Sequence, residues 1–131
     1  MRFLIDTDIC SYAIARRPAV LAHWANYRRG DMVISAVSEA ELRFGAAKNR
    51  SRIAMDELDE FLRPYEILEF SRAHTTEYGE LKAVLERRGQ RIGDNDMLIA
   101  AQAVATDLIL VTNNEREFRR VPGLKIENWA A

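Results

Sequence analysis

The sequence has few of the residues that mark specialised protein classes. Of its 131 residues, one is cysteine, three are proline and six are glycine. The single cysteine, Cys10, cannot form an intrachain disulfide or a thiolate metal cluster. The first apolar run ends at Asp6, too early for a signal peptide, and no later run approaches the roughly 20 residues of a membrane span. These absences predict one globular domain, residues 1–131, that is cytoplasmic and does not associate with a membrane.

An excess of charge of either sign is also missing. The 19 Lys and Arg residues nearly balance the 20 Asp and Glu residues, for a formal net charge of −1, so no overall positive field attracts nucleic acid. Only three of the cations are lysines. Arginine grips phosphate through two parallel hydrogen bonds, although a GC-rich coding sequence produces the same excess of arginine. With two histidines and one cysteine, a metal site in this chain would depend on oxygen ligands.

Short apolar runs and helical patterns alternate along the chain. Strands are expected at 3–5, 32–34, 65–70, 108–111 and 124–127. Helices are expected at 9–15, 18–29, 35–47, 51–62, 71–88, 94–106 and 114–120, the first of them capped by Thr7 or Asp8 and the third by Ser35 or Ser38. This alternation predicts an α/β fold with a doubly wound parallel sheet of about five strands flanked by helices.

Polar side chains follow two of the expected strands directly. Asp6 follows the first strand, and Thr112, Asn113 and Asn114 follow the strand at 108–111. Functional crevices of open parallel sheets lie at the carboxyl ends of the strands. If the two strands are neighbours, these side chains share one crevice.

Glu41 interrupts an apolar helical pattern. In the helix at 35–47, the expected buried stripe consists of Val37, Ala40, Phe44 and Ala47. Glu41 lies one turn after Val37, at the margin of that stripe, and is therefore expected to be partly buried.

Asp96 lies in the first turn of the apolar helix at 94–106, where the helix dipole favours a carboxylate and capping alone would explain it. Asp94 is expected at the start of the same helix, and both Asp8 and Asp94 would add negative potential to the rim of the crevice. Three inward carboxylates, Asp6, Glu41 and Asp96, would repel one another unless a cation neutralised them. An all-oxygen set of ligands favours Mg²⁺ or Mn²⁺ over zinc.

Four segments in this order resemble a known family. They are Phe3-Leu4-Ile5-Asp6-Thr7-Asp8, Ser38-Glu39-Ala40-Glu41-Leu42-Arg43-Phe44-Gly45-Ala46, Ile92-Gly93-Asp94-Asn95-Asp96-Met97-Leu98-Ile99-Ala100-Ala101 and Leu110-Val111-Thr112-Asn113-Asn114-Glu115-Arg116-Glu117-Phe118. Together with the closing residues 121–129, they resemble the PIN-domain ribonucleases of the VapC toxin family over essentially the whole chain.

The resemblance implies a PIN-domain fold and a catalytic site that holds Mg²⁺, for which Mn²⁺ can substitute, through Asp6, Glu41 and Asp96. The fourth acid of the family is open here, because Asn114 takes one expected position and Glu117 supplies an acid one helical turn later. Glu117 fills the role, or Asn114 binds through its carbonyl or through water. Thr112 is implied to orient a carboxylate or a water molecule.

The resemblance also implies an activity and partners. The family hydrolyses phosphodiester bonds of RNA, here structured RNA such as tRNA, to inhibit translation, leaving a 5′-phosphate and a 3′-hydroxyl. A cognate VapB-type antitoxin is expected to hold the toxin inactive, and the toxin is expected to form a homodimer. RNA-binding candidates are Arg87, Arg88 and Arg91, with further basic groups at 43–52 and 116–120. Contacts with partners or packing in the core would equally explain Tyr12, Trp24 and Tyr27.

Three other functions fit parts of the sequence. Asp6 and Asp8 after an apolar strand resemble the nucleophile motif of haloacid dehalogenase-like phosphatases, although Cys10 and the short chain do not fit that family. A receiver-like signalling module would need an acid and a lysine at strand ends where Ser35 and Thr112 stand. A PIN domain that binds RNA without cutting it is a third alternative, prompted by Asn114.

Overall fold

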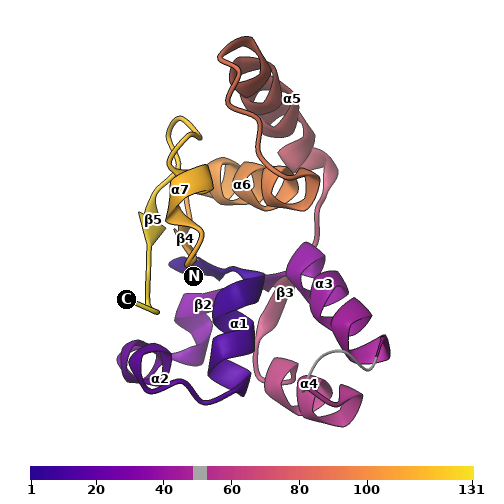
Figure 1. Ribbon diagram of the computed structural model, residues 1–131, viewed down its shortest axis with the longest axis vertical. Helices are drawn as coiled ribbons and strands as arrows, with labels where there is room; N and C mark the ends of the chain where they lie inside the picture. Colours follow the sequence, from indigo (N-terminus) through magenta and orange to yellow (C-terminus); the bar gives the residue numbers. More distant parts are fainter. Residues whose placement is uncertain (49–52) are drawn as a thin grey trace.

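A computed structural model describes residues 1–48 and 53–131 and shows a parallel sheet covered by helices on both faces (Figure 1). The strands are β1 (Phe3–Ile5), β2 (Met32–Ser35), β3 (Glu66–Leu68), β4 (Ile109–Val111) and β5 (Ile126–Glu127). Their spatial order is β3-β2-β1-β4-β5, and every neighbouring pair is parallel. The predicted doubly wound sheet of five strands is confirmed.

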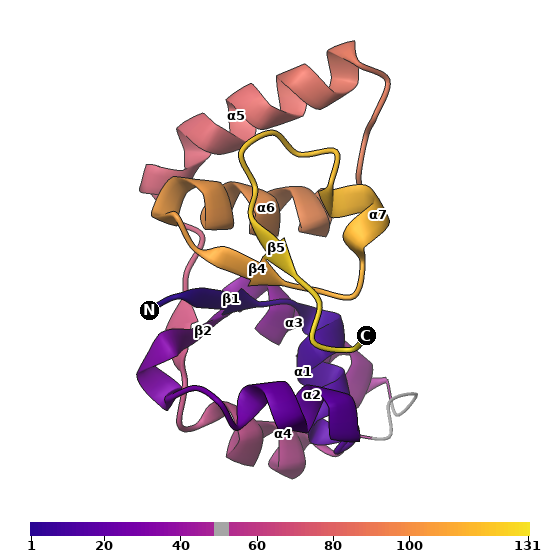
Figure 2. The same ribbon diagram turned by 90° about the vertical axis from the view of Figure 1, so that its left-hand side faces the viewer.

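The helices follow the predicted alternation. They are α1 (Thr7–Ile14), α2 (Pro18–Trp24), α3 (Ala36–Ala47), α4 (Met55–Leu62), α5 (Arg72–Arg87), α6 (Asp94–Thr106) and α7 (Glu115–Phe118), with a short 3₁₀ turn at Arg29–Asp31. Figures 1 and 2 show α6 on one face of the sheet with α5 stacked beyond it, and α1, α2 and α4 on the opposite face. No helix of the described residues is long and apolar enough to cross a membrane.

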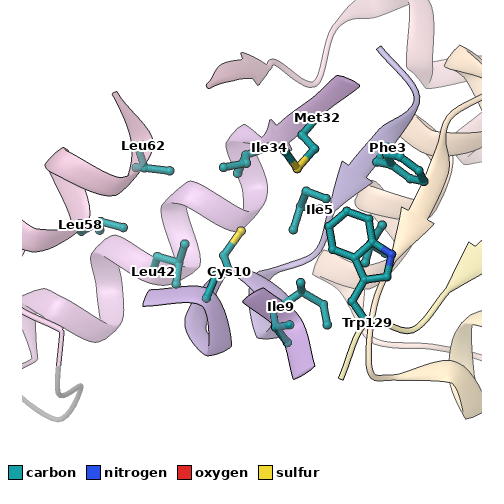
Figure 3. Packing of buried hydrophobic residues seen from close by; sticks show 13 residues of the cluster. Phe3, Ile5, Ile9, Cys10, Met32, Ile34, Leu42, Leu58, Leu62 and Trp129 are labelled. Carbon is teal, nitrogen blue, oxygen red and sulfur yellow. The ribbon is translucent and has the colours of Figure 1, made fainter. Parts of the chain in front are cut away.

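Two apolar clusters fill the space between these layers. Along β1, Phe3 and Ile5 point into the cluster beneath α1, α2 and α4, whereas Leu4 points into the cluster beneath α5 and α6. All three side chains are fully buried, which explains why the strand is apolar without alternation. Figure 3 shows the first cluster, in which Cys10 lies among aliphatic side chains and Trp129 closes the side near Phe3.

The early aromatic residues belong to this core. Tyr27 stacks on Trp129 with ring centroids 5.4 Å apart, and the indole N–H of Trp24 donates a hydrogen bond of 2.9 Å to the hydroxyl of Tyr65. Edge-to-face and stacked aromatic pairs of this kind stabilise a core beyond the area that they bury. Core packing therefore explains Trp24 and Tyr27.

A buried hydrogen-bond network fixes α6 on the sheet. The Ser35 hydroxyl donates to Oε1 of Gln102 over 2.6 Å, and Nε2 of Gln102 donates to the backbone carbonyl of Leu68 over 3.0 Å. Ser35 also accepts a hydrogen bond from the backbone N–H of Val37 and so caps α3. Because Ser35 and Gln102 are fully buried, this network satisfies polar groups that burial would otherwise penalise.

The predicted buried stripe of α3 is wrong. Phe44 is 63% exposed, whereas the buried residues of the helix are Ser38, Leu42 and Ala46. Leu42 points into the cluster that Leu58 of α4 also enters, so the position of α4 determines which side of α3 faces inward.

Several element boundaries also differ from the predictions. The helix predicted at 18–29 ends at Trp24, and the helix predicted at 114–120 spans only Glu115–Phe118. The strand predicted at 65–70 spans only Glu66–Leu68, and the last strand only Ile126–Glu127. Helix α4 begins at Met55, and the first two residues of the helix predicted at 51–62 lie outside the described residues.

Candidate active site

The predicted crevice forms at the carboxyl ends of β1 and β4. These strands are neighbours with Ile5 opposite Val111, so the residues that follow them, Asp6 and Thr112, lie side by side. The Thr112 hydroxyl donates a hydrogen bond of 2.7 Å to Oδ2 of Asp6. Figure 2 shows this edge of the sheet on the right, where α1, α6 and α7 all begin.

Asp6 is the most buried acid of the crevice, with 5% of its surface exposed. Its Oδ1 accepts a hydrogen bond of 2.8 Å from the backbone N–H of Thr7 and thereby caps α1. The predicted cap, Thr7 or Asp8, is therefore wrong: the helix predicted at 9–15 begins two residues earlier, at Thr7, directly after its cap Asp6. Burial, with the negative charge of Asp8 as the next cause, raises the pKa of Asp6 to about 7.

Asp8 braces the loop that follows β4. Its Oδ2 accepts a hydrogen bond of 3.0 Å from the backbone N–H of Asn113, and its Oδ1 accepts one of 2.7 Å from the backbone N–H of Ile9. Burial raises the pKa of Asp8, and the nearby negative charge of Glu41 adds to the increase. Asp8 thus supports the crevice and adds negative potential to it.

Glu41 reaches the crevice from α3. It is partly buried, as predicted, and its Oε1 accepts a hydrogen bond of 2.7 Å from the Thr7 hydroxyl. Sequence reasoning missed this role of Thr7. The available signal was a hydroxyl directly between the two acids Asp6 and Asp8.

Asp96 and Glu117 meet across the side chain of Asn114. Nδ2 of Asn114 lies 3.4 Å from Oδ2 of Asp96 and 3.0 Å from Oε2 of Glu117. Burial, followed by the negative charges of Glu117 and Glu41, raises the pKa of Asp96 to about 6. The structure therefore brings Glu117 and Asn114 to the same acid.

Helix capping does not explain Asp96. The N-cap of α6 is Gly93, and no side chain caps that end of the helix. Asp94 is the first residue of α6, as expected, and is exposed. An open hollow lies in front of this helix end, lined by Glu41, Gly93, Asp94, Asn95 and Asp96.

The donor set fits a hard divalent cation. Carboxylates that follow β1 and lie on α3, α6 and α7 converge without histidine or cysteine. Negative neighbours add to burial in raising the pKa values of Asp6 and Asp96. Among the described residues, no three His, Cys, Asp or Glu side chains are grouped closely enough to hold an ion together. Mg²⁺ uses one or two carboxylates and keeps several waters, so two carboxylates of this set suffice.

The basic candidates differ in their exposure and in their contacts. Arg87, Arg88 and Arg91 are exposed at the end of α5 and in the connection to α6. Arg43, by contrast, forms ion pairs with Glu39 and Asp59, which leaves it less suited to bind phosphate. Of the other basic residues predicted near it, Arg50 and Arg52 lie outside the described residues, and the Nζ of Lys48 lies over the ring of Phe44.

Two arginines of the third basic group, at 116–120, already form contacts within the protein. Arg119 pairs with Glu115, and Arg120 donates a hydrogen bond of 2.8 Å to the backbone carbonyl of Arg91. The latter contact joins the end of α7 to the segment that carries Arg91. It brings two predicted basic groups to the same side of the crevice.

Comparisons with known proteins agree with this fold. The family model described as the PIN domain matches residues 3–124. The class of protein is therefore the PIN domain, and not the phosphatases or receiver modules that share an acidic first strand end.

Named relatives identify the family within this class. The chain is 41% identical to "Ribonuclease VapC2" of Rickettsia felis, with 98% of both chains covered. It is 37% identical to "tRNA(fMet)-specific endonuclease VapC" of Shigella flexneri, with 99% of both covered. The crystal structure of VapBC2 from Rickettsia felis, bound to a DNA fragment from its promoter, contains a chain that is 38% identical and superimposes with a TM-score of 0.87 over 98% of this chain and 99% of that one. The chain belongs to the VapC family.

Proposed function

We propose that this chain is the toxin of a VapBC-type toxin–antitoxin system, a single PIN domain over residues 1–131 that hydrolyses phosphodiester bonds of RNA and thereby inhibits translation. The observation that carries the proposal is the convergence of Asp6, Glu41, Asp96 and Glu117 at one edge of the sheet, in a family whose named relatives are ribonucleases.

The activity depends on Mg²⁺, for which Mn²⁺ can substitute, held by Asp6 and Asp96 with Glu41 and Glu117 beside them. The cation supplies Lewis-acid stabilisation of the charge that develops on the phosphate and makes water a better nucleophile. The support for this part is the chemistry of the donors, which are all carboxylate oxygens.

The residues of the chain prepare this chemistry by holding the carboxylates in place. Thr112 and the backbone of Thr7 donate to separate oxygens of Asp6, so the direction of that carboxylate is set from two sides. The hydroxyl of Thr7 does the same for Glu41. Such second contacts orient ligands, and their loss costs roughly 10- to 100-fold in metal affinity or activity.

The substrate proposed is structured RNA, with tRNA favoured because a relative at 37% identity is named for tRNA(fMet). An acidic crevice repels phosphate, so affinity must come from cations at its rim. Arg87, Arg88 and Arg91 are exposed and precede α6 in the chain, and their replacement by alanine should weaken RNA binding and flatten its dependence on salt.

The partners proposed are a cognate VapB-type antitoxin and a second copy of the chain. The support is the family and its solved VapBC complexes. The apolar groove of Ala36, Val37, Ala40, Phe44 and Leu98 lies beside Glu41 and offers exposed surface for a protein contact.

The activity is tested with purified protein freed of antitoxin and incubated with total RNA and Mg²⁺. The expected result is a set of discrete cuts with 5′-phosphate and 3′-hydroxyl ends, lost with a chelator and in Asp96→Asn. The matched control is Asp56→Asn, which removes an exposed carboxylate in the first turn of α4. RNA binding without cutting would reduce the function to that of a binding module.

A further inference from the structure

Asn114 contacts two of the four acids of the site directly and a third through the Thr112 hydroxyl. Its side-chain nitrogen lies 3.0 Å from Oε2 of Glu117 and 3.4 Å from Oδ2 of Asp96. Its backbone N–H donates over 3.0 Å to the Thr112 hydroxyl, which in turn donates to Asp6. No other described side chain of the crevice contacts two of these carboxylates.

The orientation of the Asn114 amide follows from its neighbours. A side-chain amide has two N–H donors on nitrogen and only acceptor lone pairs on oxygen. Because both neighbours are carboxylate oxygens, nitrogen must face them, with one hydrogen available to each. The carbonyl oxygen is on the other branch of the amide, so in this arrangement Asn114 faces the acids as a donor.

The backbone N–H of Asn114 also orients the Thr112 hydroxyl. The Thr112 oxygen accepts from the N–H of Asn114, so the Thr112 hydroxyl hydrogen is free to point at Asp6, only 2.7 Å away. Asp6, which follows β1, is thus connected through Thr112 and Asn114 in the loop after β4 to Asp96 on α6 and Glu117 on α7.

We propose that Asn114 is a positioning residue that acts as a neutral clamp, donating hydrogen bonds to the carboxylates of Asp96 and Glu117. An aspartate at this position would have no hydrogen to donate and would place three carboxylates together. This inference rests on the proposed function and specifies how the site is held for its cation.

A double-mutant cycle on Mn²⁺ affinity, measured by calorimetry, tests the clamp. Asn114→Ala is expected to weaken Mn²⁺ binding about tenfold in the wild-type background. In the Glu117→Gln background the same change should weaken binding clearly less than in wild type, because Asn114 then holds only one carboxylate, that of Asp96. Equal weakening in both backgrounds would show that Asn114 does not act through Glu117 and would overturn the proposal, as would no weakening in either.

A metal-free measurement tests the clamp without relying on the proposed function. In chelator at pH 8, Asn114→Asp should lower the melting temperature by about 3 °C or more, because it exchanges a donor for a third adjacent charge. Adding Glu117→Gln should recover most of that loss. The matched control is Asn95→Asp, which adds the same charge to the same hollow from an exposed position and should cost less.

Together, the metal-free melting temperatures and the binding and cleavage assays show whether the clamp or the proposed function is wrong. Recovery by Glu117→Gln in a protein that neither binds Mn²⁺ nor cuts RNA would leave the clamp intact and refute the proposed function. RNA cleavage by a protein in which Asn114→Asp costs no more than Asn95→Asp would refute the clamp and leave the function intact.

Discussion

Asp6 shows how a single buried carboxyl couples stability to the site. It is 5% exposed, and in the absence of a cation its pKa is raised to about 7 from an ordinary value of 3.8. Between these two pH values the folded protein holds a proton that the unfolded chain releases, so stability falls as pH rises through this window. Ionising Asp6 in the folded protein therefore lowers the free energy of unfolding.

Replacing Asp6 should therefore stabilise the metal-free protein at neutral pH. Asp6→Asn keeps the shape and does not titrate, so its advantage over wild type should grow between about pH 4 and pH 7, with an upper bound of about 4 kcal/mol. Urea unfolding in chelator at pH 5 and pH 8 measures the difference. Asp56→Asn serves as the control, and the prediction fails if the Asp6→Asn and wild-type curves run parallel across this range.

The identity of the site acids could largely be predicted from the sequence, but their contacts could not. Asp6 and Thr112 were predictable because each follows an apolar strand, and strand ends meet at one edge of a parallel sheet. The residue that caps α1 could not be predicted, because Asp6, Thr7 and Asp8 are three consecutive residues that can all cap a helix. Only the position where β1 ends decides among them.

Helix α3 shows why the inward face of an element is harder to predict than its existence. Its apolar residues fit two neighbouring stripes, one through Phe44 and the other through Leu42. The packing of α4 decides between them, and α4 comes from a later part of the chain.

The two stripes differ in their contribution to stability. Leu42→Ala, at a site 6% exposed, should lower the free energy of unfolding by about 2–4 kcal/mol, because it leaves a cavity in the core. Phe44→Ala should lower it by about 0.5 kcal/mol or less, because that ring is mostly in solvent. Urea denaturation of the two variants checks this difference, and an equal loss in both would place Phe44 in the core after all.

The polar contact between α6 and the sheet should also be measurable. Gln102→Leu removes the partner of the buried Ser35 hydroxyl and of the Leu68 carbonyl, and should cost about 1–3 kcal/mol of unfolding free energy. The same change at the exposed Gln90 is the control and should cost little. If Gln102→Leu is as stable as wild type, the network does not fix α6.

At the scale of the whole molecule, the fold brings together acids that are far apart in the sequence. The four acids of the site come from β1, α3, α6 and α7, and the parallel order of the sheet places the starts of α1, α6 and α7 at one edge (Figure 2). The alternation of strands and helices was sufficient to predict this sheet, because right-handed crossovers leave few other topologies. The arrangement of side chains at that edge depends on long-range contacts, such as that of Asn114 with Asp96, that no local pattern encodes.

The central claim is that these acids hold a divalent cation that RNA cleavage requires. The most direct test is the rate of cleavage of a purified tRNA under single turnover as Mg²⁺ is titrated from chelator upward. Wild type and Asp56→Asn should show the same saturable increase, whereas Asp6→Asn and Asp96→Asn should cleave at no Mg²⁺ concentration. Cleavage that persists in chelator, or that survives both of these substitutions, would contradict the claim.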